Sequence, residues 1–215
     1  MPPLPKTTRL IRYRIKPRQY GTVSTILECL MTNQISPEHW IEAGLKELGR
    51  GGIDRVRVEV LAKRLGLTKG GFYRRFKDRR ALLDAILHAW TRDRIAALEK
   101  LAELRDDESA RDRLKSLITL YSERINSEGM AIELAIRQWA RFDKSALGAV
   151  ASVDSARLKT SAQLYRRMGL TAQDAQARAV LLYSFIFGRS LIFLEQTARN
   201  QARLAAACTD ALTRM

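Results

Sequence analysis

The residues best suited to recognition chemistry lie in one short stretch, Thr68-Lys-Gly-Gly-Phe-Tyr-Arg-Arg-Phe-Lys-Asp-Arg. Lysine and arginine donate to guanine edges or neutralise phosphates, and a tyrosine hydroxyl can donate to a phosphate. If Thr68 caps a helix, its outer face carries Lys69, Tyr73 and Arg74, with Lys77 and Arg79 just beyond. A single basic helix face is more often simply solvated. The order and spacing of these residues together nevertheless predict contact with DNA.

Two glycines stand inside this expected helix, at Gly70 and Gly71. Each costs about 1 kcal/mol there relative to alanine, so a compensating gain is expected. Close approach of the backbone to DNA would supply that gain. Phe72 and Phe76, by contrast, are expected to be core residues without a direct role.

A preceding helix must brace this one. Residues 56–60 alternate as a strand would, but Val58, Leu61, Ala62 and Leu65 follow helical spacing until Gly66 stops the run. Two short helices joined by Gly66-Leu67 are the geometry of a helix-turn-helix, here at roughly residues 57–76.

The remaining chain predicts helices almost everywhere from Ser36 onward. Ser36-Pro37 combines a capping residue with proline at the first helical position. Asp78 can cap a long helix, and Thr171 with Asp174 forms a variant capping box. Further helices are expected near residues 114–125, 132–139, 147–168 and 171–196, and in the Ala-rich C-terminal segment. The predicted class is all-α.

The charge of the chain is strongly basic, with 38 Lys+Arg against 23 Asp+Glu. Such a field favours polyanionic partners. Residues 1–30 hold four of the five prolines and scattered basic side chains, without helical periodicity. This segment is either a disordered basic arm that adds phosphate contacts or a non-native extension before a true start at Met31, and we favour the second interpretation. A secretory signal is rejected, because no cleavage pattern follows Val23–Met31.

Residues 49–83 resemble the N-terminal domain of the tetracycline-repressor (TetR) family of bacterial regulators. The matching positions are Gly49, Leu61-Ala62, Leu65-Gly66-Leu67, Thr68-Lys-Gly-Gly-Phe-Tyr, Phe76, Arg79 and Leu82-Leu83. The resemblance implies a three-helix DNA-binding unit joined by a long helix to a larger helical domain that dimerises and binds a small molecule. It places Thr68, Lys69, Gly70, Gly71, Tyr73 and Arg74 in the recognition helix, and Lys77 and Arg79 at phosphates.

Two positions depart from the family pattern. Arg80 stands where an acid is common, which puts a local charge pairing in doubt, and Val58 stands where Thr or Ser often caps the second helix. The expected domains are an extension at 1–35, a helix-turn-helix domain at 36–83, and a dimerisation and ligand-binding domain at 84–215.

The longest apolar stretch, residues 179–194, is shorter than the ~20 residues that span a bilayer and contains Arg189. A helix that is apolar nearly all round must be buried on two sides, which predicts a dimer interface shared with the helix of residues 147–168. The effector is unknown. Tyr121, Trp139, Tyr165 and Tyr183 could line its pocket but are more often core residues, and Arg137 with Asp154 predicts an ion pair between helices.

Other classes of function fit the sequence less well. The two histidines, His39 and His88, have no matching Cys or acidic cluster, and no phosphate loop or nucleophile elbow is present, so neither an enzyme nor a metal or cofactor site is expected. Cys29 and Cys208 suggest free thiols in a reducing cytoplasm. The sequence therefore predicts a cytoplasmic homodimeric regulator, with repression as the favoured role, that binds an inverted-repeat operator in double-stranded DNA and responds to a small molecule.

Overall fold

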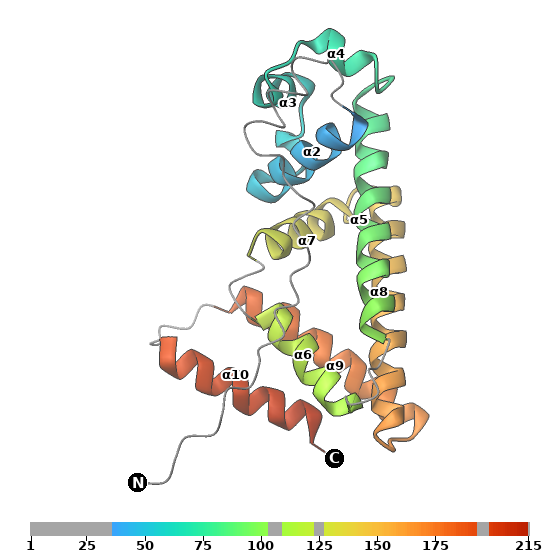
Figure 1. Ribbon diagram of the computed structural model, residues 1–215, viewed down its shortest axis with the longest axis vertical. Coiled ribbons are helices and arrows are strands. Elements are labelled where there is room, and N and C mark those ends of the chain that lie inside the picture. Colours follow the sequence, from blue (N-terminus) through green and yellow to red (C-terminus); the bar gives the residue numbers. More distant parts are fainter. Residues whose placement is uncertain (1–35, 103–108, 123–126, 193–197, 215) are drawn as a thin grey trace. The chain divides into compact units, whose positions relative to one another are not determined.

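The structure, a computed structural model, describes residues 36–102, 109–122, 127–192 and 198–214. Every regular element in these ranges is helical, which confirms the predicted all-α class (Figure 1). The α-helices are α2 (Pro37–Gly51), α3 (Val58–Leu65), α4 (Lys69–Tyr73), α5 (Arg79–Ala102), α6 (Ala110–Ser122), α7 (Ser127–Trp139), α8 (Lys144–Arg167), α9 (Ala172–Leu191) and α10 (Ala198–Thr213), and a 3-10 turn, η1 (Ile53–Arg55), follows α2.

The helices from Pro37 onward form one compact unit. The predicted division after residue 83 falls within α5 and stays a prediction. The predicted extension at 1–35, with the proposed start at Met31, lies outside the described residues.

The predicted capping residues begin their helices. The Thr68 hydroxyl accepts from the Gly71 N–H at 3.3 Å, and the Asp78 carboxylate accepts from the Ala81 N–H at 2.8 Å. The Thr171 hydroxyl accepts from the Asp174 N–H at 3.1 Å and donates to the Asp174 carboxylate at 2.7 Å, which confirms Thr171 as the cap of α9. The sequence did not predict Asp143, which caps α8 by accepting from the Ala146 N–H at 3.0 Å.

Two helix ends differ from the sequence prediction. Helix α4 ends at Tyr73, so Phe76 follows the helix instead of lying within it, although its N–H still bonds the Phe72 carbonyl at 3.0 Å. Helix α9 ends at Leu191 rather than near Gln196, and α10 is a separate helix. No helix among the described residues is long and apolar enough to cross a membrane.

The core around the helix-turn-helix is aromatic. Phe72 and Trp40 are fully buried, and their rings meet edge to face with centroids 5.3 Å apart. Phe76 stacks on Phe72 at 5.5 Å and is also buried. The prediction that both phenylalanines are core residues is confirmed, and this packing fixes α4 against α2.

The C-terminal helices have their own core, built mainly between α6, α8 and α9. Tyr165 and Tyr183 belong to this core, and Trp139 is also buried, so the structural interpretation of these aromatics is confirmed. The Tyr165 hydroxyl donates to the Leu212 carbonyl at 3.1 Å, and burial raises its pKa to about 12. The side chain of Tyr121 lies outside the described residues.

Helices α2 and α7 approach each other closely at Gly49. A Cβ atom on Gly49 would lie 2.9 Å from Cγ1 of Ile132 and 3.4 Å from its backbone nitrogen. Since real Cβ atoms essentially never come that near to another heavy atom, glycine is required for this contact. The contact joins the helix that supports the helix-turn-helix to a helix of the C-terminal part.

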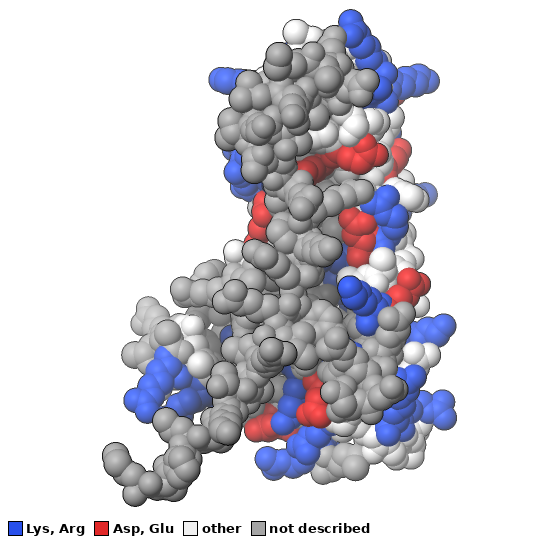
Figure 2. Space-filling model, in the orientation of Figure 1, with Lys and Arg blue, Asp and Glu red and all other residues white. Residues whose placement is uncertain are grey.

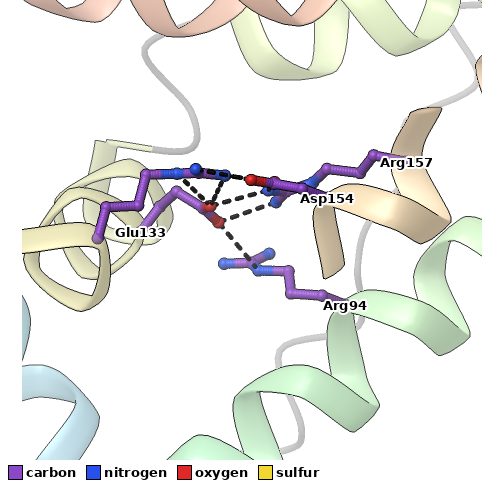
Figure 3. A network of polar contacts seen from close by, with 5 residues as sticks. Arg94, Glu133, Asp154 and Arg157 are labelled. Carbon is purple, nitrogen blue, oxygen red and sulfur yellow. Dashed lines mark hydrogen bonds and ion pairs between the residues drawn. The ribbon is translucent and has the colours of Figure 1, made fainter. Parts of the chain in front are cut away.

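A network of charged side chains ties α5, α7 and α8 together (Figure 3). Glu133 on α7 accepts two bonds of 2.8 Å from Arg157 on α8, and Arg94 on α5 lies 3.9 Å away. Arg137 binds Asp154 through both carboxylate oxygens, at 2.5 and 2.9 Å. The predicted Arg137–Asp154 pair is therefore confirmed, as one part of a larger network that holds three helices.

Candidate DNA-binding site

The turn between α3 and α4 has the geometry of a helix-turn-helix. Gly66 takes a left-handed conformation, φ 67°, which L side chains rarely adopt. The Leu67 N–H returns to the Ala62 carbonyl at 2.8 Å and closes the end of α3. The chain can then turn at once into Thr68, whose side chain caps α4. Glycine at 66 and threonine at 68 thus set the angle between the two helices.

The exposed side chains of α4 are the ones that the sequence singled out. Tyr73 is 59% exposed although its ring packs edge to face on buried Phe72, at 5.2 Å. The side chain of Lys69 is also 59% exposed, and Arg74 at the end of α4 lies on the surface. The structure therefore brings Lys69, Tyr73 and Arg74 together on a helix whose opposite side is anchored in the aromatic core.

Nothing within the described chain requires glycine at positions 70 and 71. A Cβ atom on Gly70 would meet only the Thr68 hydroxyl, at 3.6 Å, and one on Gly71 would meet only Leu67, at 4.0 Å. Both distances are ordinary van der Waals contacts. Internal packing of the described residues therefore does not explain the two glycines.

Lys77 and Arg79, the predicted phosphate contacts, are placed differently. Lys77 is exposed in the turn after α4. Arg79 donates from Nε to the Val56 carbonyl at 2.6 Å and from one terminal nitrogen to the Ile53 carbonyl at 2.7 Å. Its guanidinium therefore fastens the start of α5 to η1, and its contact with phosphate stays a prediction.

The two departures from the family pattern have clear local consequences. The structure places Arg57 at the cap position of α3 and Val58, the expected capping position, as the first residue of the helix; the Arg57 side chain makes no capping bond. Arg80 pairs with Asp84 at 2.9 Å and with Asp143 at 2.5 Å, and donates to the Ser145 hydroxyl at 2.6 Å. The basic side chain at 80 thus connects the start of α5 to the start of α8.

One carboxylate beside the recognition helix was missed from the sequence. Glu59, in the first turn of α3, lies 2.7 Å from the ammonium of Lys69. The hydrogen bond between them raises the pKa of Lys69 and lowers the pKa of Glu59. The two positions are ten apart in the sequence, and only the packed helix-turn-helix shows that they meet.

Positive charge gathers around α4 and the start of α5 (Figure 2).

Away from α4, Glu47 on α2 is almost fully buried and pairs with Arg50, Arg55 and Arg64. The first two are 56% exposed and the third 28%. These ion pairs join α2, η1 and α3 through one glutamate.

Comparison with known proteins supports this description. Residues 41–86 match the family described as "Bacterial regulatory proteins, tetR family". That range contains α3, the Gly66 turn and α4, together with most of α2 and the start of α5. No curated protein matches the chain.

Solved structures share the fold over most of the chain. A protein from Rhodococcus sp., described as a TetR-family transcriptional regulator, is 22% identical, with a TM-score of 0.66 over 82% of this chain and 98% of its own. A regulator from Saccharomonospora viridis in complex with choline is 18% identical, with a TM-score of 0.69 over 83% and 95%. NemR of E. coli in its reduced form is 17% identical, with a TM-score of 0.59 over 82% and 96%.

Residues 41–86, which contain the helix-turn-helix, are thus similar to the tetR family of bacterial regulatory proteins. The family match rests on the helix-turn-helix, and the structural matches extend the fold to the C-terminal helices.

Proposed function

We propose that this protein is a cytoplasmic, homodimeric repressor that binds an inverted-repeat operator through α4 and releases it when a small molecule binds the C-terminal helices. The DNA-contacting residues in this proposal are Thr68, Lys69, Gly70, Gly71, Tyr73, Arg74, Lys77 and Arg79. Catalysis has no part in it.

The exposed face of α4 is the observation that carries the proposal. Lys69, Tyr73 and Arg74 supply donors for base edges and phosphates, while buried Phe72 holds the helix in place. A helix this short can enter the major groove only if its N-terminal end comes close to the bases, which suits the two glycines at 70 and 71.

Helix α9 supports the dimer. One side is buried within the chain through Ala179, Leu182 and Ile186. The other side exposes large apolar side chains, with Val180 46%, Leu181 56% and Leu191 62% exposed. Water contact along a row of apolar residues is costly, and a two-fold related copy of α9 would cover the same row on each chain.

The exposed surface of α8 gives less support as the second interface helix. Leu147 is its one large exposed apolar side chain among the described residues. Helix α10 instead exposes Leu204 beside a hollow of about 430 Å³ between α9 and α10. We therefore propose α9 as the centre of the interface with α10 beside it, in place of the α8–α9 pairing that the sequence suggested.

Response to a small molecule rests on the relative from Saccharomonospora viridis, which holds choline. In this chain the route from a ligand to DNA would run through α7. This helix joins the charged network to α2 at the Gly49–Ile132 contact. A ligand that displaced α7 would shift the support of the helix-turn-helix and weaken operator binding.

The proposal is tested by selecting binding sites from a pool of random double-stranded DNA, followed by titration of the selected site against random competitor. A regulator of this kind prefers an inverted repeat by about 10³ or more at physiological salt. Binding that is weak and equal on all sequences would instead indicate an architectural protein that coats DNA.

The dimer is tested separately by sedimentation of the Leu181→Glu variant. We expect a folded monomer that no longer binds the inverted repeat, because two charges would face each other across the two-fold axis. A Leu147→Glu variant on α8 serves as the matched control and should remain dimeric.

A further inference from the structure

Glu59 places a negative charge beside the first basic residue of the recognition helix. Its carboxylate lies 2.7 Å from the ammonium of Lys69, and both side chains are 59% exposed. An exposed ion pair of this kind adds little to folding stability. Its position at the proposed DNA-binding surface therefore calls for an explanation other than stability.

DNA presents a dense row of phosphates to any protein that approaches it. A carboxylate near that row is repelled, and a lysine already paired with a carboxylate is a weaker partner for a phosphate. Both effects oppose non-specific binding, which depends almost entirely on phosphate neutralisation. Specific binding loses less, because base contacts and a fixed position of Lys69 contribute to it as well.

We propose that Glu59 is a specificity-determining residue, which holds Lys69 at the N-terminus of α4 and lowers the affinity of the protein for non-operator DNA. The inference rests on the proposed operator binding by α4. Discrimination then comes partly from a repulsive group, which is a general way to separate a correct partner from abundant incorrect ones. An exposed glutamate, whose ordinary pKa is 4.5, is charged at neutral pH, and the hydrogen bond with Lys69 lowers the pKa of Glu59 further.

The structure provides a matched control pair. Lys46 and Glu42 on α2 also lie 2.7 Å apart, with side chains 33% and 38% exposed. They have the same charges at the same distance, but they belong neither to α3 nor to α4. Glu42→Gln removes one negative charge from the same domain without touching the recognition helix.

The test measures the dissociation constants of wild type, Glu59→Gln and Glu42→Gln for a selected operator and for random DNA, across a salt series. We expect Glu59→Gln to bind random DNA about threefold more tightly near 0.1 M salt. Its salt dependence on random DNA should steepen by about 0.9, the contribution of one released lysine. The affinity for the operator should change less, so the ratio of operator affinity to random-DNA affinity should fall. Glu42→Gln should leave this ratio unchanged.

Several outcomes would overturn the inference. An unchanged affinity for random DNA would show that Glu59 does not oppose non-specific binding. If the ratio of operator to random-DNA affinity falls only because operator binding weakens, Glu59 positions Lys69 but does not oppose non-specific binding. Glu59→Ala is the second variant and must move random-DNA affinity in the same direction. Failure of wild type to select any operator would contradict the proposed function instead, which is a separate result.

Discussion

In two regions of the molecule a buried glutamate pairs with three arginines. The two clusters differ in how far their arginines are exposed to water. Glu47 and Glu133 have nearly equal side-chain exposure, 3% and 4%. Around Glu47, Arg50 and Arg55 are each 56% exposed, whereas around Glu133 the side chain of Arg157 is only 1% exposed. The arginines of the first cluster can return to water if the glutamate is lost, and Arg157 cannot.

The difference shows where each part of the protein tolerates change. The Glu47 cluster joins α2, η1 and α3 through arginines that are largely in contact with water. Each of its ion pairs therefore contributes little to stability. The Glu133 cluster is enclosed by α5, α7 and α8, and its members depend on one another because an unpaired buried charge is costly. Three arginines against Glu133 and Asp154 leave one excess positive charge among these five residues.

The largest expected effect is the loss of stability in Glu133→Gln. Removing the carboxylate takes away the two 2.8 Å bonds of buried Arg157 and leaves its longer pair with Asp154, at 3.3 Å, so the free energy of unfolding should fall by about 3 kcal/mol. The matched variant Glu47→Gln should lose about 1 kcal/mol, because its arginines become hydrated. Urea unfolding of both variants measures the difference. If the free energy of unfolding falls equally in both variants, the exposure of the arginines does not determine the effect of removing the glutamate.

The same comparison has a consequence for pH. Burial raises the pKa of Glu133, but bonds from Arg157 and the charges of Arg137 and Arg94 outweigh it and hold the pKa below its ordinary value of 4.5. A carboxylate whose pKa is lowered in the folded state stabilises it above the unfolded value, and that stability is lost as pH falls through the folded value. We therefore expect wild type to lose stability below about pH 4.5.

Unfolding free energies between pH 3 and 6 check this expectation. In the Glu133→Gln variant the free energy of unfolding should depend less steeply on pH, because residue 133 no longer titrates. An identical slope in wild type and variant would contradict the assignment.

A smaller effect is expected at the contact that lies between the two clusters. Gly49 is two residues after Glu47, and Ile132 directly precedes Glu133. Gly49→Ala should push α2 from α7 and reduce the free energy of unfolding by about 1–3 kcal/mol. Gly148→Ala on α8 meets nothing within 4 Å and should instead stabilise the helix by about 0.5–1 kcal/mol. Thermal unfolding distinguishes them, and stabilisation by both would mean that α2 and α7 are not in close contact.

The smallest effect tests whether the clusters are energetically independent. The Glu47→Gln and Glu133→Gln losses should add to within about 0.5 kcal/mol in the double variant, because no residue is shared between them. A larger coupling, measured in the same urea titrations, would show that strain passes between α2 and α7 through Gly49.

The sequence predicted the helices well because capping and periodicity are local properties. Thr68, Asp78 and Thr171 each cap a helix by bonding a backbone N–H three residues later. Gly66 lies at a turn that requires a left-handed backbone. The Arg137–Asp154 pair was also within reach, because the helices on either side could be placed from the same patterns.

The interactions that the sequence did not reveal join positions far apart in the chain. Glu59 meets Lys69 only once α3 and α4 are packed, and Arg80 meets Asp143 across 63 positions. The resemblance predicts that Arg79 contacts phosphate, which stays a prediction, and the structure adds that two of its donors bond the Val56 and Ile53 carbonyls. Charge and spacing cannot show which donors the fold itself will use.

The central claim is that α4 recognises DNA through its exposed face, and titration of a selected operator with Lys69→Ala and Tyr73→Ala tests it most directly. Both side chains are more than half exposed, so the variants should remain folded dimers. We predict that each loses operator binding, by about tenfold or more. Unchanged affinity in both folded dimers would contradict the account and place the recognition surface elsewhere.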